Sequence, residues 1–312
     1  RSHGQTGPVT AAASLDAIPA RDRTMAVARI ETAYQALRRQ RRAAGLLAVA
    51  ILAVAFVASA VMAEFYPARL DAGLPRVGEY FAKLVPDLRW EALFAGPRTE
   101  GSVAYWFYRI DEWAWLIFET ANMAALATLM GAVGALLLCF PAAANLAPNV
   151  WAFRFVRRFL ELFRTVPEIV YALILVWAFG VGPLAGILAI ALHTTGALGK
   201  LFAEAVENTD MRPWEGVRAA GGTWLMGVRY AIVPQVLPDF LSYVLLRFEI
   251  NVRGASVIGF VGAGGIGQEI YQVIAFSYYE EIGAIVLLVV LTVAMIDLVS
   301  ERLRHAVIGR IG

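Results

Sequence analysis

The sequence predicts an all-α protein that crosses a membrane about six times. Three observations support this prediction: an apolar composition, several charge-poor stretches of membrane-spanning length, and the placement of the basic residues. Of the 312 residues, 59% are hydrophobic and only 17% are charged, and the mean hydropathy is +0.63. A soluble domain is about 45–50% apolar and about 25% charged. A soluble fold of this composition would expose large apolar patches, which argues against an ordinary soluble enzyme.

The predicted spans follow from the length of the apolar stretches. A helix needs about 20 apolar residues to cross a hydrocarbon core of about 30 Å. The stretches that meet or approach this length are 43–63, about 115–140, 169–179 extended backwards by 151–167, about 184–202, about 236–260, and 282 to about 299. The fifth is unusually polar, and the third, fourth and fifth are shorter than the others or carry charges.

The basic residues predict the orientation of these spans. Lys and Arg are enriched in cytoplasmic loops of membrane proteins. In this chain, arginines precede the first span, separate the second from the third and the fourth from the fifth, and follow the sixth. The residues concerned are Arg29, Arg38, Arg39, Arg41, Arg42, Arg154, Arg157, Arg158, Arg164, Arg212, Arg218, Arg229, Arg302, Arg304 and Arg310. Both termini are therefore predicted to be cytoplasmic.

The same reading divides the chain into segments. They are a basic cytoplasmic segment at 1–42, a first span at 43–64, an extracytoplasmic or interfacial segment at 65–114, a core at 115–304 with a long loop at 204–238, and a cytoplasmic tail at 305–312. Within the first segment, 21–42 is expected to form a basic amphipathic helix along the membrane surface.

Catalytic, metal and cofactor sites are not expected. The three histidines, His3, His193 and His305, lie far apart, and none has a second ligand at helical spacing. The one cysteine, Cys139, excludes a disulfide framework and a cysteine-rich metal site. There is no Gly-x-Ser-x-Gly elbow and no phosphate-binding Gly-x-x-x-x-Gly-Lys-Ser/Thr loop. The net charge of +2 gives no argument for nucleic-acid binding.

A glycine-rich stretch after the fifth span resembles a nucleotide-binding pattern in form only. Gly262, Gly264 and Gly267 fit Gly-x-Gly-x-x-Gly, with Gly265 between them. The stretch follows a membrane-length helix and belongs to no βαβ unit, so a dinucleotide site is not expected. Glycines allow sharp turns and close backbone approach, and these predict a tight extracytoplasmic or re-entrant loop.

The loop at 204–238 is the most informative part of the sequence. Pro213 suits the first turn of a helix, because the backbone N–H that proline lacks would have no partner within the helix there. Glu215 suits the same turn, because its negative charge interacts favourably with the positive N-terminal end of the helix. Gly221 and Gly222 are expected to break this helix, and a second helix is expected over 223–232, ending before Pro234. Because a span precedes and follows this helix–turn–helix loop, a soluble partner could bind it from the cytoplasm.

Here the sequence resembles a known family, the ABC importer permeases. Glu215, Gly221 and Pro234 have the spacing of the family's "EAA" loop, although Gly216 and Val217 replace its two alanines, and Ala231 and Val233 replace its Ile and Leu. Four further stretches resemble the phosphonate-type permeases: 164–168, 180–183 with 192–204, 248–253, and 259–267. The resemblance covers about 119–304.

This resemblance implies a fold, a function and a set of partners. The fold would be the type I ABC importer permease fold, in a homodimer in a bacterial plasma membrane. Two ATP-binding subunits, carrying ATP and Mg, would dock on the loops, and an extracytoplasmic binding protein would deliver phosphonate or a related oxyanion such as phosphite or phosphate. The chain itself would be no enzyme. Glu215 would make the coupling contact, with Gly221 and Gly222 as the turn; the alternative is an ordinary solvated loop.

Ionisable residues within a span usually face a cavity or one another. Glu249, Asn251 and Arg253 lie in the fifth span, and Glu249 and Arg253 are spaced to pair on one helix face. Arg253 could line the pathway and attract an anion, or the pair could pin the fifth span to the third or fourth through Glu168 or Lys200. The remaining pathway candidates, each also able to form an interhelical hydrogen bond, are His193, Thr194, Thr195, Glu119 and Asn122.

Two other functional classes are compatible with parts of the sequence. An ATP-independent secondary transporter or channel for a small anion would explain the spans and the charges within them, but not the EAA-type loop. An integral membrane enzyme would need clustered polar groups near one membrane interface, and the sequence shows no such cluster.

Overall fold

The structure is a computed structural model that describes residues 20–311, and all of its regular secondary structure in that range is helical. It separates into two compact units, residues 1–78 and residues 79–312. Residues 1–19 of the predicted basic segment, which include His3, and Gly312 of the predicted tail lie outside the described residues. The predicted segment boundaries themselves stay predictions.

The first unit consists of one long helix and most of a second. Helix α1 runs from Ala20 to Met62 and α2 from Pro67 to Leu84. The expected amphipathic helix over 21–42 is not separate from the first span, because α1 is continuous through both. The cause is local: this stretch contains no proline and is rich in alanine, the strongest helix former. Positive φ at Glu64 (52°) accompanies the turn between the helices.

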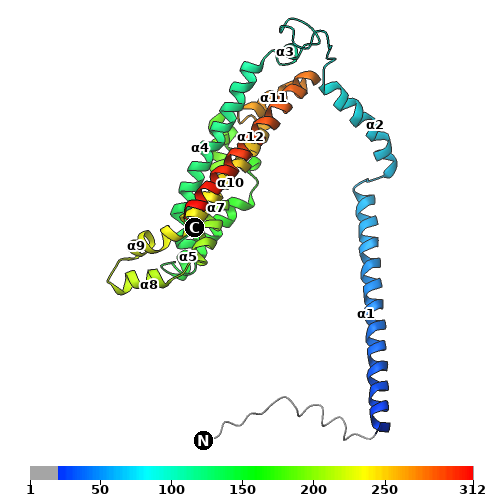
Figure 1. Ribbon diagram of the computed structural model, residues 1–312, viewed down its shortest axis with the longest axis vertical. Coiled ribbons are helices and arrows are strands. Elements are labelled where there is room, and N and C mark those ends of the chain that lie inside the picture. Colours follow the sequence, from blue (N-terminus) through cyan, green and yellow to red (C-terminus); the bar gives the residue numbers. More distant parts are fainter. Residues whose placement is uncertain (1–19, 312) are drawn as a thin grey trace. The chain divides into compact units, whose positions relative to one another are not determined.

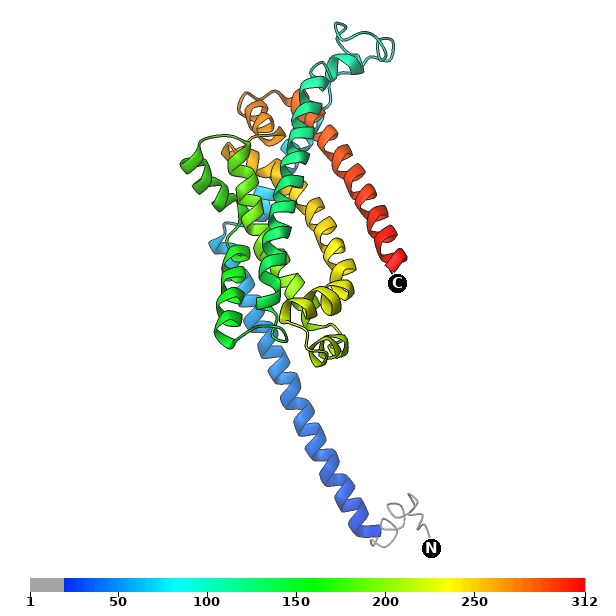
Figure 2. The same cartoon turned by 90° about the vertical axis from the view of Figure 1, so that its left-hand side faces the viewer.

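The second unit is a helical bundle with α7 at its centre (Figures 1 and 2). Its helices are α3 (Val103–Trp106), α4 (Ile110–Ala142), α5 (Val150–Thr165), α6 (Glu168–Phe179), α7 (Pro183–Glu207), α8 (Arg212–Ala219), α9 (Trp224–Gly227), a π-helical turn (Val228–Ile232), α10 (Val233–Ile258), a 3₁₀ turn (Gly259–Val261), α11 (Ile266–Ala275) and α12 (Tyr279–Ile311). Helix α7 packs against α4, α5, α6 and α10.

Among the described residues, four helical stretches are long and apolar enough to cross a membrane: Glu31–Met62, Ile110–Ala142, Pro183–Glu207 and Tyr279–Ala306. Helices α5 and α6 would together form a fifth, bent by 86°. Helix α10 does not have this composition because it carries Asp239, Arg247, Glu249 and Arg253. It nevertheless packs along α4, α7 and α12.

The bend between α5 and α6 differs from the single extended third span that the sequence predicts. Helix α5 ends at Thr165, and Val166 after it has an extended ψ of 124°, because a residue before proline is disfavoured in the helical region. Helix α5 then lies against the second half of α7. Its Leu160 occupies the space beside Gly199, where an added Cβ would come within 2.6 Å of the leucine side chain, so the two helices approach closely.

The two ends of the bundle carry different features. Helices α8 and α9 lie at one end, and α3 and α11 lie at the other (Figure 1). Between the two ends, small residues lie where helices cross. A Cβ added to Gly131 on α4 would lie 2.6 Å from Thr194 on α7. This close packing holds α4 and α7 side by side through the centre of the bundle.

Candidate functional site

The first candidate site is helix α8 and its turn, within the long loop at 204–238. Pro213 lies in the first turn, as predicted, and Glu215 is the acidic residue of that turn. Helix α8 ends at Ala219, and Gly221 follows with φ +83°, a conformation that favours glycine. A Cβ added to Gly222 would lie 2.7 Å from the carbonyl oxygen of Val217. The predicted glycine turn is therefore confirmed.

An acidic side chain precedes α8. The backbone N–H of Arg212 donates to Asp210 Oδ1 at 3.0 Å, and its guanidinium lies 3.1 Å from Oδ2. These contacts lower the pKa of Asp210, chiefly through the backbone hydrogen bond and then through the Arg212 side chain. The carboxylate thus stabilises the start of the helix, where backbone donors lack partners within the helix.

The expected end of the second helix before Pro234 is wrong. Thr223 caps α9 by accepting a hydrogen bond from the backbone N–H of Met226 at 3.4 Å, and the chain continues through the π-helical turn into α10. Proline has no N–H and crowds the carbonyl four residues earlier. The π-helical turn, with its wider hydrogen-bond spacing, lies where that conflict would arise. The loop's second helix is therefore continuous with α10.

Two tryptophans join α8 to the bundle. Gly227 lies so close beneath Trp214 that an added Cβ would be 2.5 Å from two of its ring atoms. Trp214 also meets Trp224 edge to face, with 6.5 Å between ring centroids. The Trp224 Nε1–H donates to the carbonyl oxygen of Leu146, just beyond α4, at 2.9 Å. Helix α8 is thus connected to α9, which continues into α10, and through Trp224 to the segment that follows α4.

These connecting residues were not among the candidates predicted from the sequence. The available signal was a tryptophan on each side of the glycine turn, Trp214 and Trp224. The predicted contact residue, Glu215, is exposed and forms no ion pair within the part of the chain that the structure describes. One face of α8 is therefore packed on the bundle, and the other is open to a partner.

The second candidate site is the set of polar residues around α10. Asn251 is completely buried. Its amide Nδ2 donates to Thr128 Oγ1 on α4 at 2.8 Å and to Thr194 Oγ1 on α7 at 3.0 Å. Because buried polar groups are costly without partners, this network fixes the three helices relative to one another. Asn251 and Thr194 therefore contribute interhelical hydrogen bonds, and their place in a pathway stays a prediction.

The predicted ion pair between Glu249 and Arg253 is confirmed. The pair does not extend to Glu168 or Lys200, the links suggested from the sequence. It extends instead to α12. Arg253 Nη2 lies 3.3 Å from Asp297 Oδ2, and Arg304 Nη2 lies 3.7 Å from Glu249 Oε2. The Arg253 side chain remains 49% exposed. The ionic cluster therefore lies between α10 and α12 and leaves part of its guanidinium accessible.

The expected links of this pair to the third and fourth spans are replaced by other contacts. Lys200 pairs with Glu204 on its own helix, at 3.4 Å. The Glu168 carboxylate lies beside Gly254, where an added Cβ would displace it. His193 Nδ1 lies 3.1 Å from the carbonyl oxygen of Val166, at the break between α5 and α6. These residues hold α6, α7 and α10 together but do not meet Arg253 in a single site.

The glycine-rich loop is tightly folded, as predicted. Gly262, Gly264 and Gly265 have φ of +86°, +82° and +70°. The Gly182 N–H donates to the carbonyl oxygen of Gly262 at 2.9 Å, so the loop lies against the α6–α7 connection. Figure 2 shows this part of the bundle from the side.

The following residues fasten the loop to the bundle. The Ile266 N–H donates to Thr120 Oγ1 on α4 at 2.8 Å. A Cβ on Gly267 would collide with the carbonyl oxygen of Ser256. The loop is packed against protein on these sides, which agrees with a structural role for its glycines.

Comparisons with known proteins agree on one family. Residues 135–312 match the family described as "Binding-protein-dependent transport system inner membrane component". The putative phosphite transport system permease protein HtxC of Stutzerimonas stutzeri is 33% identical over 88% of this chain and 89% of its own length. A putative cryptic phosphonate transport system permease, PhnE2 of Escherichia coli, is 46% identical over 38% of this chain and 96% of its own.

Solved structures show the same fold. The inward-facing MetNI methionine ABC transporter gives a TM-score of 0.54 at 23% identity, covering 62% of this chain and 97% of the compared chain. An amino acid ABC transporter gives 0.52 at 16% identity, covering 64% and 98%. With its helical bundle and its several apolar helices, the chain is a multi-pass membrane protein. It belongs to the binding-protein-dependent inner membrane permeases of ABC importers.

Proposed function

We propose that this chain forms the translocation pathway of an ATP-driven importer for phosphonate or a related oxyanion, phosphite or phosphate. The substrate class is supported by the names of the relatives, which are phosphite, phosphonate and phosphate permeases. The observation that carries the coupling part of the proposal is helix α8. It is exposed on the Glu215 face and is joined by Trp214 to Trp224 of α9, which is in turn hydrogen-bonded to the connection between α4 and α5.

The proposed assembly is a homodimer of this chain with two ATP-binding subunits and an extracytoplasmic binding protein. The ATP-binding subunits carry ATP and Mg, since this sequence has no phosphate-binding loop. Both termini and α8 face the cytoplasm, in agreement with the distribution of arginines. The glycine-rich loop and α11 then face the opposite side, where the binding protein would arrive.

Coupling follows from the contacts of α8. When ATP brings the two partner subunits together, each displaces one α8, with Glu215 in the contact. Because Trp214 is packed on Gly227 of α9, the displacement passes into α9 and on through the π-helical turn into α10. Bistable packing of this kind converts a small movement at one site into a change of state elsewhere.

Within the pathway, Arg253 is the proposed anion contact, with Glu249 as its partner. Its guanidinium can bind phosphoryl oxygens bidentately, and half of its surface is free to do so. The acids around it keep the interaction weak, which suits a residue that must release what it binds. Asn251, Thr194 and His193 keep α10 and α7 in position beside it.

The coupling role is tested by Glu215→Lys in the assembled complex in proteoliposomes. The variant should insert, co-purify with the ATP-binding subunits and hydrolyse ATP, yet lose uptake that depends on the binding protein. A charge-matched control is Glu301→Lys, at an exposed position on α12, which should behave as the unaltered protein does. Normal uptake by Glu215→Lys would show that this residue does not couple.

The pathway role is tested by Arg253→Leu and Arg253→Lys. If Arg253 contacts the anion, both variants should assemble, with Lys retaining more uptake than Leu because it keeps the charge. Failure of Arg253→Leu to assemble, with full uptake by Arg253→Lys, would assign the residue to packing. Competition for uptake among phosphonate, phosphite and phosphate identifies the cargo. Uptake that continues without ATP would instead indicate a secondary transporter.

A further inference from the structure

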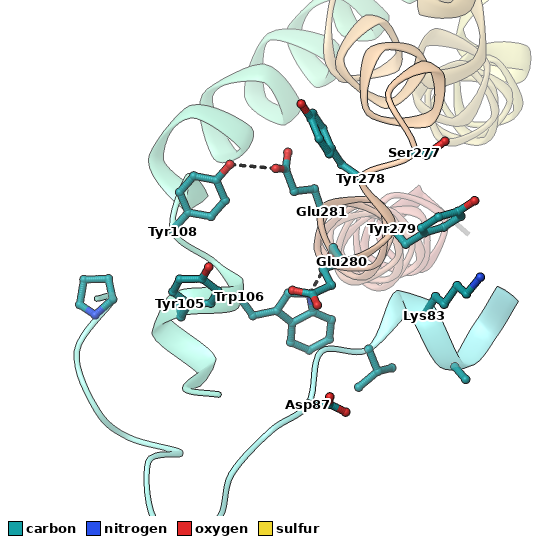
Figure 3. Close-up of a pocket in the computed structure, with 13 residues that line it drawn as sticks. Lys83, Asp87, Tyr105, Trp106, Tyr108, Ser277, Tyr278, Tyr279, Glu280 and Glu281 are labelled. Atoms are coloured by element: carbon teal, nitrogen blue, oxygen red, sulfur yellow. Dashed lines mark hydrogen bonds between the residues drawn. The ribbon is translucent and has the colours of Figure 1, made fainter. Parts of the chain in front are cut away.

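A large cavity (Figure 3) lies beside α3, at the end of the bundle opposite α8 (Figure 1). Its volume is about 740 Å³, within the range of about 300–1,000 Å³ typical of small-molecule sites. The end of α2, the segment before α4 and the start of α12 line it. Most of these residues precede 135, where the family match begins. The cavity is therefore built largely from a part of the chain that the family match does not cover.

The walls of the cavity are held in place by hydrogen bonds and an ion pair. The Trp106 Nε1–H donates to the carbonyl oxygen of Glu280 at 2.8 Å, and the Tyr108 hydroxyl donates to Glu281 Oε1 at 2.9 Å. Arg109 forms ion pairs with Glu269 at 2.8 Å and with Glu281 at 3.8 Å. These contacts join the segment before α4 to α11 and α12, so the cavity has a defined shape.

The lining combines aromatic rings with negative charge. Five aromatic side chains and three carboxylates line the cavity together with a single cation, Lys83. The carboxylates of Asp87 and Glu280 take part in no ion pair among residues 20–311. Lys83 Nζ already lies over the ring of Tyr279, 5.4 Å from its centroid. An ammonium group on an aromatic face is thus present in the structure itself.

We propose that this cavity binds an alkylammonium group. The negative faces of aromatic rings attract such cations, and Asp87 and Glu280 supply the charge to balance one. An anionic cargo would be repelled by the excess of carboxylates, so this site is separate from the oxyanion pathway and does not depend on it. The ammonium group can come from a phospholipid headgroup or from a free solute, since aromatic residues of this kind gather at membrane interfaces.

The test uses the intact complex in phosphatidylglycerol nanodiscs and two probes of the same shape, choline and the uncharged 3,3-dimethyl-1-butanol. Isothermal titration should show choline binding at least about tenfold tighter, because only choline carries the charge that the lining recognises. Glu280→Gln and Asp87→Asn should each weaken choline binding several-fold. Glu91→Gln is the matched control, at an exposed position outside the lining; it should bind choline as before.

Equal binding of the two probes would overturn the proposal, as would unchanged choline affinity in both Glu280→Gln and Asp87→Asn. Unfolding temperatures and uptake measured on the same preparations show that each variant is folded. Repeating the titration in phosphatidylcholine nanodiscs separates the two sources. Loss of choline binding there would assign the site to the lipid headgroup, and retained binding would assign it to a free solute.

Discussion

Replacing Gly227 with alanine should weaken the packing of α8 on the bundle. The new Cβ would lie 2.5 Å from Cε3 and Cζ3 of Trp214, far inside van der Waals contact. The ring has little room to move, because Trp224 stands against it at 6.5 Å between centroids. Overpacking of this kind costs about 1–3 kcal/mol. The equilibrium constant for seating α8 on α9 should therefore fall by about 5–150-fold.

The matched control is the same substitution in α8 itself, Gly216→Ala. A Cβ added to Gly216 meets nothing within 4 Å, and alanine is about 1 kcal/mol more favourable than glycine inside a helix. In proteoliposomes containing the assembled complex, Gly227→Ala should keep ATP hydrolysis while transporting fewer substrate molecules per ATP. Gly216→Ala should transport at least as many substrate molecules per ATP as the unaltered protein.

The reasoning is refuted if Gly227→Ala and Gly216→Ala transport equally well per ATP. A double variant tests whether the steric clash, and not a failure of the complex to assemble, causes the loss of transport. In the double variant Trp214→Leu with Gly227→Ala, the smaller side chain makes room for the new methyl group. It should recover part of the lost transport if the clash is the cause, because contacting residues are energetically coupled. No recovery in an assembled complex would contradict the proposed contact.

Three other predictions concern stability and pH. Asn251→Ala should lower the free energy of unfolding by about 1–3 kcal/mol, measured in detergent, because two buried threonine hydroxyls lose their amide partner. Gly264→Ala should cost about 1–2 kcal/mol in the same assay, since its φ is +82° and Pro183 lies 3.1 Å from the added Cβ. Asp210→Ala should reduce hydrogen-exchange protection of α8 at pH 7. This difference should begin to shrink as the pH falls below about 4, the ordinary pKa of an aspartate, and should disappear only below the lowered pKa of Asp210, because the carboxylate stabilises the folded protein only while it is ionised.

The features that the sequence predicted correctly depend on neighbours along the chain. Pro213 and Gly221 bound a short helix through their own backbone preferences. Glu249 and Arg253 are one helical turn apart, so their pairing needs no knowledge of the fold. Such local rules act before any tertiary contact forms, and they are readable in a single sequence.

The features that it did not predict depend on which helices lie side by side. Asp297 is 44 residues from Arg253, and only the packing of α12 on α10 brings them together. Pro234 should end a helix by local rules, but the bundle keeps the chain helical through a π-helical turn. Gly227 beneath Trp214 is likewise a tertiary contact, because a glycine in sequence does not reveal what its missing side chain makes room for.

The contacts of α10 indicate which part of the bundle would move with α8. Helix α10 runs without interruption from Val233 to Ile258, and its two ends meet the π-helical turn and the segment that leads into the glycine-rich loop. Buried hydrogen bonds from Asn251 fasten it to α4 and α7, whereas its charged links to α12, from Arg253 to Asp297 and from Glu249 to Arg304, are longer, at 3.3 and 3.7 Å, and involve less buried side chains. A displacement that enters through Trp214 should therefore carry α4, α7 and α10 together and change their contacts with α12.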